Sequence, residues 1–502
     1  MLAAVETRNP LAVSFGHESG ALSGDSLCPD PNQFRRDHNG HPSCEQNLDR
    51  TTVGTVRRVV LATIFPERFG GGVGVVAHEL ARHLAERYQV LLLCPGEKTA
   101  LVTRNNGMKV LTVASAGPDE VYYPFLDRAT YDRAIAWLDE FRPDVVHGHD
   151  PVMLGAIAQY YALRHSVPFV MTLHWLPDRI LEFGAGARSV LRNQWLVRPV
   201  VRSYINRFLN DCDGIIAINE SVIRGLRGRA LRARVFRISN GRDLSRFRSC
   251  PFADAASKVR NLCFIGYLSE RKNQLYLLKV LEHLPANYRL QLIGKALTPS
   301  YERELRSYAS AHGLNNVEFL GQKDQSEIPA CLAGTHAFVS ASQLEVQSLT
   351  VIEALASGTP VVGLANETID ELVDDKVGRH LSRDAAPDEF ARSVEQVCNL
   401  PQAEYDRICR RARARVALMD WTQVADATAA AYEMLVGEFR PQARMRRAPA
   451  LTVHGLNPLT YIYGHLNMSA SAFFYACHHY WRQMQWLTHA AASGPFHSGR
   501  PD

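Results

Sequence analysis

The sequence has no apolar run near the 18 or more residues that a membrane-spanning helix needs. It also lacks a basic N-terminal segment followed by an apolar core, so we expect no signal peptide. The ten cysteines show no C-x-x-C pair and no metal-ligand spacing, and several lie in apolar runs, which indicates small buried side chains in a reducing compartment. These absences predict a cytoplasmic protein, either soluble or peripheral at the inner membrane face.

The charge balance is mild, because 56 Lys and Arg residues against 51 Asp and Glu residues give a net charge of +5. There are no repeated motifs of basic and stacking aromatic residues, so we expect no nucleic acid partner. Hydrophobic residues make up 46% and charged residues 21%, as in soluble globular proteins. A chain of 502 residues is too long for one core and predicts two domains with extensions.

The first half of the chain follows a strand–helix–strand pattern. Residues 1–55 are rich in Gly, Pro, Asn, Asp and Ser and predict a disordered tail. A buried-strand run at 56–65, a glycine loop at 69–74, a helix and a strand at 89–94 predict a βαβ unit, and therefore a parallel sheet. Further strands are expected at 144–147, 168–173, 214–218 and 235–238, with a helix at 152–165 and a long basic helical stretch at 178–210.

A second series of the same kind follows, with strands at 261–265, 288–293, 317–320, 337–340 and 360–363 and helices at 274–284 and 301–312. We therefore predict an α/β fold of two Rossmann-like, doubly wound parallel-sheet domains that face each other across a cleft, where such folds bind ligands. The expected divisions are a first Rossmann-like domain at 56–250, a second at 251–420, a hinge near 245–258, a closing helix at 421–437 and an extension at 438–502.

Two glutamates, Glu345 and Glu353, stand eight positions apart before the run Ala-Leu-Ala-Ser-Gly-Thr-Pro-Val-Val. If 348–357 is helical, a rise of ~1.5 Å per residue separates the two by at most ~12 Å, about the span from a sugar ring to the ribose of a nucleotide-sugar. The first amides of the helix carry partial positive charge, which suits a diphosphate between them. Taken alone, the spacing is more typical of a capped surface helix than of a binding site.

Two more segments offer contacts to phosphate. The glycine loop at 70–74 places amides at a helix start, although a tight strand-to-helix turn also needs glycine, and it matches neither the dinucleotide nor the P-loop pattern. Arg271 and Lys272 follow the first strand of the second domain, where two cations can meet a diphosphate leaving group. A solvated basic loop is the alternative for this pair.

Histidines follow two strands of the first domain: His147 and His149 at one, and His174 at the next. A side chain at the carboxyl end of a parallel strand faces the cleft, where imidazole can hydrogen-bond sugar hydroxyls or a phosphate. We favour His174 for this role and packing for His147. No third ligand stands at metal spacing, so we expect no zinc site. The sequence 211–213 matches D-x-D in letters but directly precedes a strand, so we interpret it as a strand-entry turn.

Taken in order over residues 56–437, these motifs resemble family 4 of the retaining glycosyltransferases, which have the GT-B fold. The matching segments are the glycine loop at 70–74, VVHGHDP at 145–151, TLH at 172–174, DGIIAINE at 213–220, ISNGRDLSRF at 238–247, RKN at 271–273, the two glutamates with ALASGTPVVG, and ELVDDKVGRHL at 371–381. Each is weak alone, whereas the ordered set is specific. The resemblance implies a hexosyltransferase that moves a hexose from a nucleotide-sugar to a hydroxyl of a glycan, lipid or small molecule.

The resemblance also implies roles for matching residues. Glu345 would contact the transferred sugar, Glu353 the ribose, and Lys272 the leaving phosphates. His174 would lie at the reacting face, with His149 also on the acceptor side. The implied catalytic residues are His174, Lys272 and Glu345. The implied donor-binding residues are Gly71, Gly72, Arg271, Lys272, Glu345, Ser348, Leu349, Thr350 and Glu353.

Such enzymes retain the anomeric configuration, usually need no metal or other cofactor, and use a UDP-, GDP- or ADP-sugar. The departing phosphate is thought to accept the proton of the acceptor, while the protein supplies positioning and charge stabilisation. This chain departs from the family at Tyr267, where the family commonly has Arg. A lost charge-assisted contact costs about 1.5–3 kcal/mol, which leaves a catalytically weak binding or scaffold subunit as an alternative. A sugar phosphorylase or epimerase of the same fold is a further alternative.

Two segments leave their interpretation open. The stretch 188–204 mixes Arg with Trp, Tyr and aliphatic residues, which is typical of surfaces that dock on anionic membranes and equally of an ordinary amphipathic helix. Pro199 is expected to interrupt it. Residues 440–502 are basic and then rich in aromatics and His, as in a packing helix, an interfacial anchor or a partner site.

Overall fold

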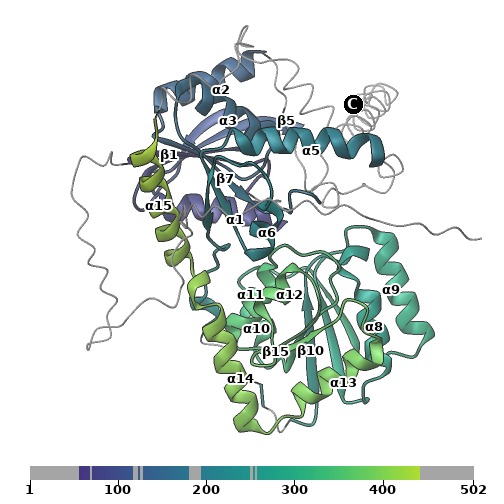
Figure 1. Ribbon diagram of the computed structural model, residues 1–502. Helices are drawn as coiled ribbons and strands as arrows, with labels where there is room; N and C mark the ends of the chain where they lie inside the picture. Colours follow the sequence, from purple (N-terminus) through teal and green to yellow (C-terminus); the bar gives the residue numbers. More distant parts are fainter. Residues whose placement is uncertain are drawn as a thin grey trace, which may run out of the picture. The chain divides into compact units, whose positions relative to one another are not determined.

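The computed structural model describes residues 56–67, 71–116, 123–124, 128–179, 194–248, 253–254 and 257–440 (Figure 1). The predicted tail at 1–55 lies outside the described residues, and so does the C-terminal extension after residue 440. Most of the basic stretch before residue 194 also lies outside them. No helix among the residues that can be described is long and apolar enough to cross a membrane.

The first domain is built on a sheet with the order β3-β4-β2-β1-β6-β7-β8-β9, to which β5 adds by pairing with β4. From β4 through β9 the neighbours on this path pair in parallel, whereas β3 and β5 run antiparallel to β4. The strands are β1 (Arg58–Ala62), β2 (Gln89–Gly96), β3 (Ala100–Thr103), β4 (Lys109–Ala116), β5 (Tyr123–Pro124), β6 (Val145–Gly148), β7 (Phe169–Leu173), β8 (Gly214–Ala217) and β9 (Arg234–Arg237).

Helices cover both faces of this sheet because successive side chains of a strand point to opposite faces. In β1, Val60 packs in a core with helices α2 (Arg128–Phe141), α3 (Met153–His165), α5 (Gln194–Asn210) and α6 (Glu220–Leu226). Its neighbours Val59 and Leu61 pack in a second core with α1 (Gly71–Leu84) and α15 (Trp421–Glu438). The last described helix of the chain therefore completes the core of the first domain, and Figure 1 shows it beside α1.

The second domain has an all-parallel sheet with the order β12-β11-β10-β13-β14-β15. Its strands are β10 (Arg260–Ile265), β11 (Tyr288–Ile293), β12 (Val317–Gly321), β13 (Ala337–Ser340), β14 (Val361–Leu364) and β15 (Gly378–Leu381). One face is covered by α8 (Gln274–Glu282), α9 (Pro299–Ala311) and α13 (Pro387–Cys398). The other is covered by α7 (Ser245–Arg248), α10 (Ile328–Leu332), α11 (Leu349–Ser357), α12 (Glu367–Leu372) and α14 (Gln402–Arg415).

The predicted architecture of two parallel-sheet α/β domains is confirmed, with three differences of detail. Leu244 and Phe247 are buried in the core of the second sheet, so the chain crosses between domains before residue 244 and not within the expected hinge at 245–258. Helix α5 continues through Pro199, which was expected to interrupt it. A proline removes one hydrogen bond, and the flanking turns of α5 remain helical. Finally, α1 begins at Gly71, so the expected loop at 70–74 is mostly the first turn of a helix.

Candidate functional site

Lys272 and Glu345 meet at the carboxyl ends of β10 and β13, which are neighbours in the second sheet. Their side chains form an ion pair, and they are 13% and 12% exposed. Gly266, which follows β10, lies beneath the lysine: a Cβ built on it would stand 3.9 Å from Lys272 Cε. The structure thus brings together two predicted catalytic residues that are 73 positions apart in the sequence, at the edge where parallel sheets bind ligands.

Helix α11 begins directly after this pair, as the sequence predicted. Ser348 is its N-cap residue, but the hydroxyl makes no capping hydrogen bond and instead lies 3.1 Å from Thr350 Oγ1. The backbone amide of Ser348 donates to Thr368 Oγ1 at 2.9 Å, so this predicted phosphate donor is already engaged. The first-turn amides of Leu349 and Thr350 have no partner within the helix, and their partial positive charge makes this end of α11 suitable for an anion.

A second helix N-terminus lies against the first. A Cβ built on Gly72, in the first turn of α1, would stand 3.8 Å from Leu349 Cδ1, and Leu349 packs against cores of both domains. Gly71 is the first residue of α1. The starts of α1 and α11 therefore lie close together, as two sources of partial positive charge.

Arg271 does not accompany Lys272 toward Glu345. The two residues belong to a short 3-10 helix, η4 (Glu270–Lys272), in which successive side chains point about 120° apart. Arg271 donates from Nη1 to the carbonyl of Leu344 at 3.2 Å and lines a neighbouring pocket. The second cation predicted for the donor site therefore lies beside that site in this structure.

Tyr267, which departs from the family pattern, has a different cation near it. Lys295 Nζ lies 5.8 Å from the centre of the Tyr267 ring, within the range of a cation–π contact. The backbone fixes this arrangement, since the amide of Leu268 donates to the carbonyl of Lys295 at 2.9 Å. Gly294 is required there, because it has φ +142 and a Cβ on it would stand 2.0 Å from the carbonyl oxygen of Gly266. The loops after β10 and β11 thus hold Lys295 above position 267.

Glu353 was predicted to contact a ribose, but in this structure its side chain is buried in an ion pair with Arg242. The two side chains are 2% and 9% exposed, and Arg242 Nε donates to Glu353 Oε1. Burial raises the pKa of Glu353, and the Arg242 guanidinium acts against that shift. Glu353 is therefore held by the protein, and sequence reasoning missed the partner because Arg242 is 111 residues away.

The three histidines at these strand ends form a buried stack. The ring centres of His147 and His149 are 4.5 Å apart and those of His149 and His174 are 5.3 Å apart. His147 contacts Tyr432 Oη at 2.6 Å and Thr172 Oγ1 at 2.7 Å, which confirms the packing role predicted for it. His149 Nδ1 and His174 Nε2 are 3.0 Å apart.

Burial keeps the stacked histidines neutral. It lowers the pKa of His147 and that of His174 to about 3, and it lowers the pKa of His149 well below its ordinary value. A neutral imidazole donates through one nitrogen and accepts through the other. His174 is therefore suited to hydrogen bonding and not to the role of a general acid at neutral pH.

The segment between the two glutamates is attached to the first domain. Val346 is 4% exposed and packs in a core of the first sheet, and its carbonyl accepts from Asn219 Nδ2. Gln347 donates to the carbonyl of Ile218 at 3.0 Å and accepts from the amide of Asn240 at 2.8 Å. We call residues 345–348 the docking loop. The contacts of the docking loop with the first domain could not be predicted from the sequence, because the residues between the two glutamates match no motif for such contacts.

Asp213 has the structural role that the sequence predicted for 211–213. Its carboxylate accepts from the amide of Phe169 at 2.8 Å, at the start of β7. Among the described residues there is no group of three or more His, Cys, Asp or Glu side chains arranged to hold a metal ion.

The two halves of the chain match two family models. Residues 70–246 match Glycosyltransferase Family 4, and residues 252–415 match Glycosyl transferases group 1. The first match ends shortly after the crossing between the two domains, and the second match covers most of the second domain.

Curated relatives point the same way. The glycogen synthase of Mycobacterium tuberculosis (strain CDC 1551 / Oshkosh) is 30% identical over 321 residues, which cover 61% of this chain and 72% of that protein. The alpha-monoglucosyldiacylglycerol synthase of Streptococcus pneumoniae is 25% identical over 278 residues, which cover 52% of this chain and 61% of that protein. The D-inositol 3-phosphate glycosyltransferase of Mycobacterium marinum is 23% identical over 433 residues, which cover 79% of this chain and 90% of that protein.

Solved structures share the fold. Sucrose-phosphate synthase from Thermosynechococcus elongatus superposes with a TM-score of 0.62 at 19% identity, over 76% of this chain and 99% of that one. The HepE protein of Anabaena in complex with UDP superposes with a TM-score of 0.60 at 18% identity, over 75% of this chain and all of that one. At this identity the likeness shows the fold alone.

Proposed function

Because this chain belongs to family 4 of the glycosyltransferases and is a glycosyltransferase of the GT-B fold, we propose that it transfers a hexose from a nucleotide-sugar to an acceptor hydroxyl with retention of the anomeric configuration. The observation that carries the proposal is the largely shielded Lys272–Glu345 ion pair beside the first turn of α11. This arrangement supplies a cation, a carboxylate and two backbone donors within one small region.

Each group has a task in such a transfer. As the bond between the sugar and the diphosphate breaks, negative charge grows on the phosphates, and the Lys272 ammonium and the amides of Leu349 and Thr350 are oriented in advance to stabilise it. Glu345 accepts hydrogen bonds from sugar hydroxyls and fixes the ring relative to the acceptor. The departing phosphate takes the proton of the acceptor hydroxyl on the face that it leaves, which gives retention.

The donor in this proposal is a UDP-, GDP- or ADP-hexose. The UDP and UDP-glucose complexes of HepE support a nucleotide-sugar for this fold and make UDP-glucose the first donor to test. Lys295 provides a second cation near the phosphates in place of the family arginine that Tyr267 replaces. The proposal assigns charge stabilisation to Lys272, Lys295 and helix amides, so it requires no metal ion, and excess EDTA is expected to leave the rate unchanged.

The acceptor is a hydroxyl of a glycan, a lipid or a small molecule, and a named relative supports each class. Glycogen, monoglucosyldiacylglycerol and inositol 3-phosphate all appear in the relatives' names. The six free cysteines among the described residues fit a reducing, cytoplasmic location. The lipid class would place the enzyme at the inner membrane face.

The proposal is tested by incubating the protein with UDP-, GDP- and ADP-glucose, with and without acceptors, and following sugar release or transfer by NMR. The expected result is one active donor and an α-linked product from an α-linked donor. Lys272→Gln is expected to lower kcat at least a hundredfold. Lys279→Gln, at an exposed lysine of α8, is the matched control and should leave kcat unchanged. An inverted product would contradict the retaining mechanism.

A further inference from the structure

A pocket of about 570 Å³ opens beside the Lys272–Glu345 pair. Its floor is formed by the carboxyl ends of β13 and β14 and by the segment after β15. Ala341, Ser342, Leu344 and Leu364 contribute buried surface to it, and Tyr276 from α8 provides an aromatic wall. Its volume is in the range of small-molecule sites.

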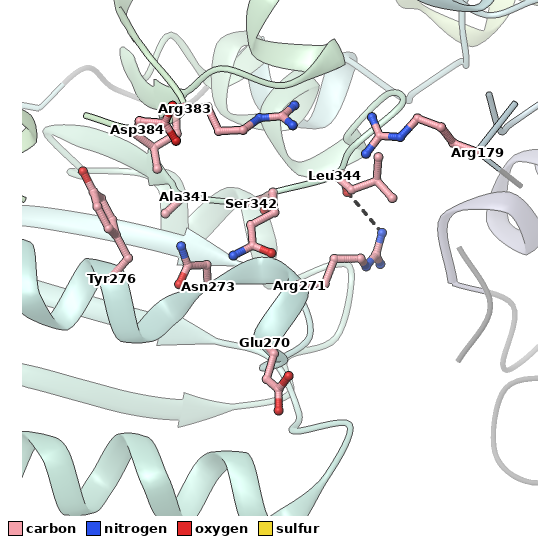
Figure 2. A pocket seen from close by; sticks show the side chains of 12 residues that line it. Arg179, Glu270, Arg271, Asn273, Tyr276, Ala341, Ser342, Leu344, Arg383 and Asp384 are labelled. Atoms are coloured by element: carbon pink, nitrogen blue, oxygen red, sulfur yellow. Dashed lines mark hydrogen bonds between the residues drawn. The ribbon is translucent and has the colours of Figure 1, made fainter. Parts of the chain in front are cut away.

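Three arginines line this pocket and come from separate parts of the chain. Arg271 lies on η4, Arg383 follows β15, and Arg179 belongs to the first domain. Figure 2 shows all three guanidinium groups turned toward Leu344. Like charges repel, so their convergence without a ligand is unfavourable, and an anion between them would remove that repulsion.

Of the acidic residues described near the pocket, Glu367 compensates the charge of Arg179, whereas the others lie away from the guanidinium groups of Arg271 and Arg383. Glu270 points away from the three guanidinium groups, and Asp384 lies on the Tyr276 side (Figure 2). Glu367 holds Arg179 at 2.8 Å and so fixes the position of that guanidinium.

The other two arginines are anchored by backbone oxygens. Arg271 Nη1 donates to the carbonyl of Leu344 at 3.2 Å, and Arg383 Nε donates to the carbonyl of Ala365 at 3.5 Å. A guanidinium has five N–H donors in a planar fork, and each of these bonds uses one. Forks held in this way match the oxygens of a phosphate.

The pocket shares a wall with the donor site. Leu344 and Glu345 are consecutive residues, as are Arg271 and Lys272, and in each pair the first lines the pocket and the second lies in the donor site. A ligand whose anionic end lies among the arginines would therefore have its uncharged end next to the sugar-binding carboxylate.

We propose that this pocket binds the phosphate of a phosphorylated polyol acceptor, such as a glycerol phosphate, and directs its hydroxyls toward the transferred sugar. The inference rests on the proposed function, because it names the class of acceptor for that reaction. The arginines anchor the phosphate, and Tyr276 and Leu344 contact the carbon chain.

The first test is calorimetric titration of the full chain with sn-glycerol 3-phosphate, in the presence of saturating UDP, with glycerol as the uncharged match. We expect binding of the phosphate ester and none of glycerol. Arg383→Gln should weaken the affinity for sn-glycerol 3-phosphate about tenfold, because one charge-assisted hydrogen bond is lost. The same variant should leave the affinity for UDP unchanged. Arg383→Lys should recover part of the loss. Arg392→Gln, at an exposed arginine of α13, is the matched control and should change neither affinity.

A second arm identifies the source of the phosphate. Vesicles of phosphatidylglycerol are compared with vesicles of phosphatidylcholine in a sedimentation assay with the same variants. Binding of phosphatidylglycerol alone, weakened by Arg383→Gln, supports the pocket and assigns a lipid head group. Binding of free glycerol phosphate assigns a soluble acceptor. If UDP binds but neither phosphate probe does, or if Arg383→Gln and Arg271→Gln both leave probe binding unchanged, the inference is overturned and the proposed function stands. If no nucleotide binds, it is the proposed function that fails.

Discussion

At the scale of single residues, the Arg242–Glu353 pair combines two roles that conflict. A buried carboxylate beside a guanidinium stabilises the fold only while both partners remain, because removal of one leaves an uncompensated buried charge. The same carboxylate was predicted to bind a ribose. Any substitution of Glu353 therefore changes stability, and a loss of nucleotide affinity in Glu353→Ala cannot be assigned to a lost ribose contact unless stability is measured too.

Glu353→Ala is expected to lower the free energy of unfolding by about 3–5 kcal/mol. Glu353→Gln, which keeps a hydrogen-bond acceptor for Arg242, should lose less, and Arg242→Met combined with Glu353→Leu should recover most of the stability. Urea denaturation of the three variants measures this. A loss below about 1 kcal/mol in Glu353→Ala would show that the pair is not buried as described.

The histidine stack predicts how stability depends on pH. His147, His149 and His174 have pKa values lowered in the folded state, so the unfolded chain binds more protons below pH 6.5 and stability falls as pH falls through that window. Burial raises the pKa of Asp150 to about 7, which acts in the opposite direction. With three histidines acting in one direction and one carboxyl in the other, the free energy of unfolding is expected to fall by at most about 3 kcal/mol per pH unit below pH 6.

Urea unfolding at pH 7.5, 6.5 and 5.5 measures that slope. His174→Gln removes one titrating group and should reduce the slope without abolishing it. Stability that is unchanged or higher at pH 5.5 than at pH 7.5 would contradict the burial of the stack.

Lys295 provides the third test at this scale. If it replaces the family arginine, Lys295→Ala should weaken nucleotide diphosphate binding about tenfold, and Tyr267→Arg in that background should restore it. Calorimetry measures both affinities. Equal nucleotide affinity in wild type and Lys295→Ala would show that Lys295 does not replace the family arginine. Charge stabilisation would then rest on Lys272 and the helix amides alone.

At the scale of elements, the docking loop links the donor site to the first domain. Gln347→Ala removes three hydrogen bonds, to Ile218, Ser239 and Asn240, next to Glu345. We expect kcat/KM for the nucleotide-sugar to fall at least tenfold, because small displacements of a positioned group are costly. Gln396→Ala, at an exposed glutamine of α13, should have no effect. A Gln347→Ala enzyme with unchanged kcat/KM would show that the loop does not position Glu345.

The elements also show what the sequence could predict. Strands β11 and β13, which are mostly apolar and buried, were predicted with their exact ends. β15 was missed because Arg379 and His380 stand in its centre, and α14 because its arginine-rich sequence hides the four residues that it buries. The Lys272–Glu345 pair forms because the two residues follow β10 and β13, which are neighbours in the second sheet. The direction of Arg271, the partner of Glu353 and the burial of His174 depend on packing between distant segments, which spacing in a sequence does not contain.

At the scale of the whole chain, the two domains are connected by two crossings that run side by side. The amide of Arg242 donates to the carbonyl of Met419 at 2.8 Å, and the amide of Trp421 donates back to the carbonyl of Arg242 at 3.2 Å. Arg242 also holds Glu353 on α11. The connection between the domains is therefore in direct contact with the helix whose N-terminus belongs to the proposed donor site.

The most direct test of the central claim is calorimetric titration of the chain with UDP, GDP and ADP, for wild type, Lys272→Gln and the Lys279→Gln control. A site built from Lys272 and the start of α11 predicts that one nucleotide binds with micromolar affinity, that Lys272→Gln weakens it at least tenfold, and that Lys279→Gln leaves it unchanged. Binding of none of the three nucleotides, or equal binding by wild type and Lys272→Gln, would contradict the assignment of this site.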